Sequence, residues 1–288
     1  MSLLKVIVLA IVQGLAELLP VSSSAHVVVT EKLLGLDPSS PPMTLLLVML
    51  HTGTMLAVIV YFWPRWRDTW FRSSVAFRAF AVQVVTATFF TALIGAALVK
   101  IIEKTLWRNR PQAQVEDLFS HLEFIAPALA AAGVLIVIAG IFERRHPAGA
   151  LSPGHDLNTP RAGLIGAVQG LCLPFSGFSR SGATISTGLL LGVVKSRAEA
   201  FSFALAVVLT PPVVVREALR LLHAAQGRGA DLRSAALESV LGALVAFLAG
   251  LLALRWLSRW LEGGRWYWFG IYCLFAAGAV MLLHRAGY

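Results

Sequence analysis

The sequence predicts an all-α integral membrane protein: about six transmembrane helices and two re-entrant helical hairpins in an inverted-topology repeat. The 288 residues are 57% hydrophobic and only 14% charged, whereas a soluble domain is about 25% charged. Long apolar stretches recur along the chain, and two shorter ones are interrupted by polar turns. We expect a single membrane domain over 1–288, with internal repeat 1 at about 3–142 and internal repeat 2 at about 162–284.

The formal charge of +9 would favour a nucleic-acid partner in a soluble protein. Here the arginines flank apolar segments, which is typical of anchoring to lipid headgroups. The expected partner is therefore the lipid bilayer, and no nucleic acid is expected. Cys172 and Cys273 lie in apolar stretches at no metal-like spacing, so we expect them to be core residues.

The first element is a short apolar segment, 3–19, which ends at Pro20 and resumes as a second segment over about 23–34. A half-helix of about 14 residues covers roughly 21 Å, which is less than a bilayer. The pair therefore predicts a re-entrant hairpin. Gln13 and Glu17 interrupt the region, so we expect it to be retained and not to be a cleaved signal peptide.

Six later stretches are long enough to cross the hydrocarbon core, which takes about 20 residues. Tryptophans lie at or just beyond their ends, as an interfacial belt requires, and polar loops at 102–122 and 143–161 interrupt them. Pro211 and Pro212 fall inside the fourth span and predict a kink or a break, because two backbone donors are lost. The spans are 43–63, 78–101, 123–142, 198–222, 235–257 and 266–284.

A second interrupted pair, 162–173 and 179–193, predicts another hairpin. The tetrapeptide Val-Gln-Gly-Leu at 12–15 recurs at 168–171, and the same offset of 156 residues places Ser23 on Ser179. One hairpin plus three spans leaves the chain on the opposite side, so the second copy is inverted relative to the first. Many transporters have this architecture, with the site near the midplane where interrupted helices meet. The Lys and Arg residues are too evenly distributed to set the orientation.

Polar residues gather in the first hairpin. Gln13 and Glu17 are four residues apart and share one helix face. Ser22 and Ser23 occupy the N-cap region of the second half-helix, and His26 follows within one turn. Serines alone would indicate capping and close helix packing. A carboxylate at membrane depth is costly, however, and indicates a solvated or ligand-lined cavity.

The second hairpin carries the groups that an anion needs. An arginine near mid-bilayer costs roughly 2.5–3.5 kcal/mol, so Arg180 is expected to have a function. Its guanidinium suits phosphate oxygens, Gly177 permits a tight turn, and Ser179, Ser181 and Thr184 add hydroxyls. Free N–H groups at the half-helix start favour anions as well. Together these groups predict a phosphate or diphosphate cradle that suits phosphoryl transfer better than acyl transfer.

Two further polar residues are expected to be structural. His51 lies inside the first span, where a packed histidine bonded to the backbone is expected, with a place in the lining of the cavity as the alternative. Glu199 lies near the start of the fourth span, where an interfacial ion pair with Lys195 or Arg197 is expected.

Two segments resemble the signatures of the bacterial undecaprenyl-diphosphate phosphatase family, also called bacitracin-resistance proteins. The first is Gln-Gly-Leu-Ala-Glu-Leu-Leu-Pro-Val-Ser-Ser-Ser-Ala-His at 13–26, and the second is Ser-Gly-Phe-Ser-Arg-Ser-Gly-Ala-Thr at 176–184. Weaker similarities at 56–63 and 199–207 extend the resemblance over nearly the whole chain. Position 13 is Gln where many members have Glu, position 176 is Ser where the family usually has Pro, and positions 24–25 are Ser-Ala where Thr-Gly or Ser-Gly is common.

The resemblance implies a multi-pass enzyme of the bacterial cytoplasmic membrane. It would remove the terminal phosphate from a C55 polyprenyl diphosphate and so recycle the lipid carrier for cell-wall synthesis. A divalent cation is implied, Mg²⁺ with Ca²⁺ as the alternative, held near Glu17; a homodimer is left open. The central positions are Glu17, Ser23, His26 and Arg180, and the supporting ones are Gln13, Ser179 and Thr184.

The roles within this site stay open at the level of sequence. Either Ser23 attacks the phosphorus with His26 as base, or His26 attacks directly. An Arg180–Glu17 ion pair that is purely structural is an alternative for those two residues. The alternative for the whole protein is a transporter or flippase that moves a polyprenyl phosphate, or another anionic lipid, without hydrolysis.

Overall fold

The computed structural model describes residues 2–37, 40–106, 121–146, 156–225 and 232–287, and within these ranges every regular element is a helix. The helices are α1 (Leu3–Leu18), α2 (Ser23–Leu34), α3 (Pro41–Thr69), α4 (Ser74–Leu106), α5 (Leu122–Arg145), α6 (Thr159–Cys172), α7 (Arg180–Leu190), α8 (Lys195–Ala225), α9 (Leu232–Glu262) and α10 (Tyr267–Arg285).

Six helices in the described ranges, α3, α4, α5, α8, α9 and α10, are long and apolar enough to cross a membrane. The prediction of a multi-pass, all-helical membrane protein is therefore confirmed. Most of these helices extend several residues beyond the predicted apolar cores, because their ends carry charged residues that a hydropathy limit leaves out. The central parts of the two predicted loops, 107–120 and 147–155, lie outside the described residues.

A kink or a break was predicted at the tandem prolines, and the break is wrong. Helix α8 continues through Pro211 and Pro212 as one element. Loss of two backbone donors is tolerated in a membrane helix where neighbouring groups satisfy the freed carbonyls. The hydroxyl of Thr210 donates to the carbonyl of Ala206 at 2.8 Å, whereas the carbonyls that lose their N–H donors are those of Val207 and Val208.

The four short helices form two consecutive pairs, α1–α2 and α6–α7, with bounds close to those predicted from the apolar segments. Serine caps begin the second helix of each pair. Ser22 Oγ accepts from the backbone N–H of Ala25, and Ser179 Oγ accepts from that of Gly182. Each cap satisfies one of the orphan donors at a helix start. The other N–H groups of that first helical turn lie beside the turn that joins the two helices.

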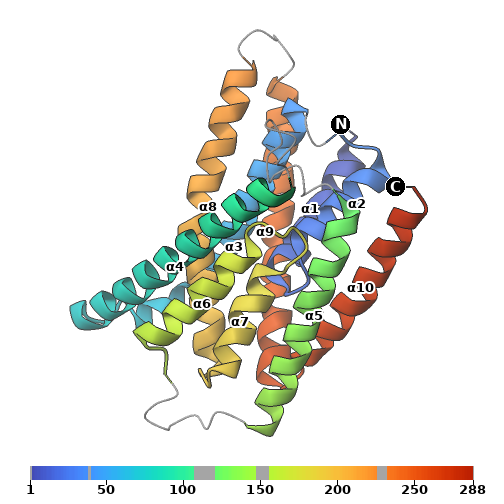
Figure 1. The fold of residues 1–288 in the computed structure, drawn as a ribbon. Coiled ribbons are helices and arrows are strands. Elements are labelled where there is room, and N and C mark those ends of the chain that lie inside the picture. The colour runs from blue at the N-terminus through green and yellow to red at the C-terminus, as the bar shows by residue number, and fades with distance from the viewer. Residues whose placement is uncertain (1, 38–39, 107–120, 147–155, 226–231, 288) are drawn as a thin grey trace.

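Helix packing brings the two turns together (Figure 1). Helix α4 runs along α6, and α9 runs along α1; α5 packs against both α7 and α10, and α3 packs against α8 and α9. The start of α1 and the end of α10 lie at the same end of the bundle. A continuous hydrophobic core surrounds the turns, and its largest fully buried side chains include Phe62, Phe201, Phe203 and Trp266.

The interfacial ion pair expected for Glu199 is wrong in its partner and its depth. Glu199 is fully buried, accepts from Arg65 at 3.1 Å and accepts from the Ser258 hydroxyl at 2.5 Å. The two cations nearby in sequence pair elsewhere, Lys195 with Glu143 and Arg197 with Asp156. Sequence proximity misled here because the buried pair joins α3 to α8, more than 130 residues apart.

Candidate active site

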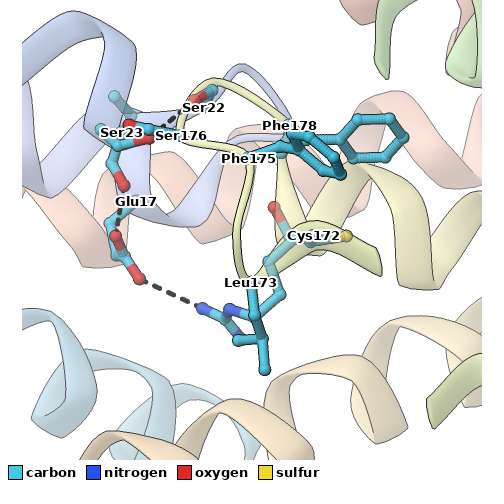
Figure 2. A pocket seen from close by; sticks show the side chains of 13 residues that line it. Glu17, Ser22, Ser23, Cys172, Leu173, Phe175, Ser176 and Phe178 are labelled. Atoms are coloured by element: carbon cyan, nitrogen blue, oxygen red, sulfur yellow. Dashed lines mark hydrogen bonds and ion pairs between the residues drawn. The ribbon is translucent and has the colours of Figure 1, made fainter. Parts of the chain in front are cut away.

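Glu17 lies at the centre of a polar cluster built by both short-helix pairs. Its Oε2 accepts from Ser23 Oγ at 2.5 Å and from Gln13 Nε2 at 3.4 Å. Its Oε1 accepts from Arg180 Nη2 at 3.1 Å. Figure 2 shows the carboxylate between the Ser23 hydroxyl on one side and a guanidinium on the other. The α1–α2 pair thus supplies an acceptor and a hydroxyl, and the α6–α7 pair supplies a cation.

A cavity of about 260 Å³ opens beside this cluster. One wall comes from the α1–α2 turn and the other from the α6–α7 turn. Phe175 and Phe178 lie together along one side of the cavity (Figure 2). The lining residues are Ala16, Glu17, Ser22, Ser23, Ser24, Cys172, Leu173, Phe175, Ser176, Phe178, Ser179, Arg180 and Ser181.

Two polar atoms of the cavity residues are buried and lack a hydrogen-bond partner within the described part of the chain. They are Nη1 of Arg180 and Oγ of Ser176. A buried donor on a charged group costs more than about 1–3 kcal/mol when unsatisfied. A ligand with several acceptor oxygens would satisfy both atoms, and the positive charge of Arg180 favours an anionic one.

The turn before Ser23 adopts a conformation that serines rarely hold. Ser22 has φ of 69°, the one positive φ of a non-glycine residue within the described ranges. Such a backbone costs of order 1–3 kcal/mol and persists only where the surroundings hold it. His26 Nδ1 contacts the Ser22 carbonyl oxygen at 2.8 Å, and Ser22 also caps α2. These contacts fix the carbonyl and direct Ser23 toward Glu17.

The His26 ring points into a different cavity from the one beside Glu17. Because the Ser22 carbonyl can only accept, His26 carries its proton on Nδ1, and Nε2 accepts from the Tyr272 hydroxyl at 2.7 Å. The two rings stack with centroids 5.7 Å apart. They line an apolar groove of about 550 Å³ between α1 and the α9–α10 region.

Comparison with known proteins identifies the family of this chain. A family model described as "Bacitracin resistance protein BacA" matches residues 6–280. The chain belongs to this family. Among curated relatives, Undecaprenyl-diphosphatase 2 of Acinetobacter baylyi is 54% identical over 287 residues, covering 98% of both chains. Undecaprenyl-diphosphatases of Rhodopirellula baltica and Desulfosudis oleivorans are 31% and 33% identical and cover at least 96% of each chain. The family resemblance seen in the two signatures is confirmed.

Most of the residues predicted from the BacA-type signatures converge on one cavity. Glu17, Ser22, Ser23, Ser179, Arg180 and Ser181 all line it. Three others lie just behind its wall: Gln13 bonds to Glu17, the Gly177 amide donates to Ser24 Oγ at 3.1 Å, and Thr184 bonds to the Arg180 carbonyl and to Ser202. His26 lies apart from these nine.

Three contacts at or near this site were not predicted from the sequence. His51 donates from Nδ1 to the Leu47 carbonyl, as expected, but its Nε2 also lies 4.0 Å from Glu17 Oε2. Ser202 lies 2.5 Å from the Thr184 hydroxyl, and Tyr272 pairs with His26. Of these three contacts, only that of His51 had a signal in the sequence, namely a histidine inside an apolar span. The pairings of Ser202 with Thr184 and of Tyr272 with His26 depend on helix packing.

A cation site in this BacA-family cavity would rest on few protein ligands. Among the described residues no three metal-ligating side chains of the His, Cys, Asp and Glu types cluster together, and Glu17 is the sole carboxylate lining the cavity. Mg²⁺ commonly binds through one or two carboxylates plus substrate phosphates. The donor set therefore fits a cation that arrives with a phosphorylated ligand.

Proposed function

We propose that this BacA-family protein hydrolyses undecaprenyl diphosphate to undecaprenyl phosphate and inorganic phosphate in the bacterial cytoplasmic membrane. The names of the full-length relatives support this substrate. The observation that carries the chemistry is the 2.5 Å hydrogen bond from Ser23 to Glu17, beside an arginine with an unused buried donor. A site that only binds the lipid would need the arginine, but it would not need a hydroxyl that is hydrogen-bonded to a carboxylate.

The cavity lies, in this proposal, near the membrane midplane between two re-entrant hairpins of an inverted repeat. Matching helix contacts support the repeat, since α1 packs on α9 as α6 packs on α4. Gly14 on α1 leaves no room for a Cβ against Ala246 and Ala249 of α9, and Gly170 on α6 leaves none against Thr91 of α4. Those two glycines are the ones matched by the sequence repeat.

Ser23 acts as the nucleophile and Glu17 as its base. Ser23 Oγ attacks the terminal phosphorus while its proton passes to Glu17 Oε2, and the bridging P–O bond breaks to release undecaprenyl phosphate. Glu17 then loses this proton to solvent. A water molecule gives a proton to the same carboxylate and attacks the phosphoserine; the P–Oγ bond breaks, Ser23 Oγ takes up that proton from Glu17, and inorganic phosphate is released. Covalent catalysis of this kind needs a base within hydrogen-bond reach of the nucleophile, and only Glu17 meets that condition for Ser23 among the described residues.

Arg180 stabilises the charge on the transferring phosphoryl group. Its Nη1 donates to a phosphoryl oxygen, and free backbone N–H groups at the starts of α2 and α7 add further donors. We propose that a divalent cation, Mg²⁺ with Ca²⁺ as the alternative, binds Glu17 together with the diphosphate. When bound, it would neutralise negative charge on the phosphate oxygens.

The apolar groove beside His26 holds the first isoprene units of the tail. It borders the polar cavity, because Ala16, next to Glu17 in the chain, lines both. In this arrangement His26 is a positioning residue that holds the Ser22 carbonyl and hence the Ser23 hydroxyl. Ser23 attack with His26 as base, the sequence-based alternative, would require the His26 ring to leave Tyr272.

The decisive experiment measures phosphate release from undecaprenyl diphosphate by detergent-purified protein, with and without Mg²⁺. The variants Ser23→Ala and Glu17→Gln test the chemistry, and Ser40→Ala is the matched control, since Ser40 is a half-buried serine at the start of α3 and lies outside the cavity. Cation-dependent release that both site variants abolish would support the proposal. Tight lipid binding without any release by the folded wild type would favour a flippase or transporter instead.

A further inference from the structure

A group of arginines and tryptophans lies at the end of α9 and in the turn before α10. Arg255, Arg259 and Arg265 line a cavity of about 550 Å³ together with Trp256 and Trp260. All three arginines are exposed, and none forms an ion pair or a side-chain hydrogen bond within the described ranges. Three unpaired guanidinium groups around one hollow attract an anion, and a forked guanidinium is suited to phosphate oxygens.

The position of this basic cavity fits the membrane interface. The span carried by α9 ends at Glu262, and Arg255 lies seven residues, or about 10 Å, before that end. Tryptophan is enriched at this level of a membrane, where an apolar ring meets lipid headgroups. In Figure 1 the end of α9 and the start of α10 lie side by side at the lower end of the bundle.

The basic cavity adjoins the apolar groove. Trp256 and Trp260 line both, so the two hollows share a wall. The groove in turn shares Ala16 with the cavity beside Glu17. The three hollows therefore lie in a row, from the interfacial arginines through a groove lined by aromatic and aliphatic side chains to the polar cavity.

We propose that Arg255, Arg259 and Arg265 form a docking site for the diphosphate of an incoming polyprenyl diphosphate. The headgroup binds there at the interface, then moves past Trp256 and Trp260 along the groove to Glu17 and Arg180, and draws the first isoprene units of the tail into the groove behind it. This inference rests on the proposed hydrolysis of that lipid. The shared tryptophans favour this occupant over bulk phospholipid, because a lipid held only for anchoring needs no path to the polar cavity.

The test compares kcat and KM for undecaprenyl diphosphate in phosphatidylcholine nanodiscs. The variants are the triple Arg255→Gln/Arg259→Gln/Arg265→Gln protein and the single Arg259→Gln protein. The matched control is Arg67→Gln, an exposed arginine paired with Asp68 on α3, which lines none of these cavities. One charge-assisted hydrogen bond corresponds to roughly tenfold in affinity. We expect KM to rise about tenfold in the single variant and more in the triple variant, with kcat within about twofold of wild type. Raising the salt concentration should raise KM of the wild type more than that of the triple variant.

Each other outcome overturns the inference in a distinguishable way. A KM equal to that of Arg67→Gln would exclude docking at these arginines. A loss of kcat with unchanged KM would mean that they act on the fold or the chemistry, and the single variant guards against failure of the triple variant to fold. A difference from wild type seen only when phosphatidylglycerol is added to the discs would identify a bulk anionic lipid as the occupant. Absence of phosphate release by the wild type itself would instead reject the proposed function.

Discussion

Replacing Gly177 by Ala tests whether the α6–α7 turn holds the site in its working geometry. Gly177 has φ of +103°, and a Cβ built there would lie 2.5 Å from the carbonyl oxygen of Ile125 on α5. Both conditions disfavour any other residue: the backbone conformation is one that L-residues avoid, and the obstacle is a helix backbone that cannot rotate aside.

The two penalties can be added roughly. A left-handed backbone costs an L-residue about 1–2 kcal/mol, and overpacking a close contact typically costs about 1–3 kcal/mol. The sum is about 2–5 kcal/mol, partly relieved if the turn moves away from α5. Movement of the turn would displace Arg180 and break the hydrogen bond from the Gly177 amide to Ser24 Oγ. A turn that moves would therefore lose less stability but would lower kcat/KM.

The assay is thermal unfolding in detergent together with kcat/KM for undecaprenyl diphosphate. We expect a melting temperature lower by several degrees, kcat/KM lower by at least tenfold, or both. The control is Gly278→Ala on α10, where an added Cβ meets nothing within 4 Å, and both quantities should stay at their wild-type values. A Gly177→Ala protein that matched this control in both measurements would refute the reasoning.

Three further substitutions test other contacts. Arg180→Lys keeps the charge but cannot contact Glu17 and a phosphoryl oxygen with separate nitrogens, so kcat/KM should fall roughly tenfold to hundredfold; wild-type kinetics would make the arginine structural. Tyr272→Phe removes a single neutral hydrogen bond to His26, which corresponds to roughly two- to tenfold in kcat, with little change in melting temperature; a complete loss of activity would instead favour direct chemistry at this histidine. Glu199→Ala removes the acceptor of Arg65 and of the Ser258 hydroxyl and should lower the free energy of unfolding by about 1–3 kcal/mol, since the Arg65 side chain is 33% exposed; thermal unfolding is measured beside Glu199→Gln, which should cost less.

The fold could be predicted from the sequence because membrane-spanning helices follow from local composition. Segments of about 20 apolar residues have few alternatives in a bilayer, and the half-length segments ended at Leu18 and at Cys172, close to the predicted limits. The tandem prolines of α8 misled because local propensity says nothing of how packing against neighbouring helices maintains a helix that lacks two backbone donors.

Pairings between distant elements were harder to predict. Ser23, Glu17 and Arg180 were expected to meet because two signatures marked both turns. The Tyr272 hydroxyl and the Arg65–Glu199 pair gave no such signal, since residues 246 and 134 positions apart meet only through helix packing. His26 illustrates the limit most clearly: spacing put it within one turn of the site serines, whereas its side chain lines the groove and not the cavity beside Glu17.

The ion pair between Arg180 and Glu17 need not be a choice between structure and function. Little hydrophobic force drives helices together inside a bilayer, so polar contacts across the two turns have to contribute: Arg180 to Glu17, Gly177 to Ser24, and the Ser181 hydroxyl to the Leu19 carbonyl. The same contacts bring the carboxylate of one hairpin against the cation of the other. A diphosphate that draws Arg180 toward its own oxygens would weaken the hold on Glu17 and make that carboxylate a stronger base for Ser23. Assembly of the two halves and activation of the nucleophile would then depend on one contact, formed without substrate and exchanged when substrate binds.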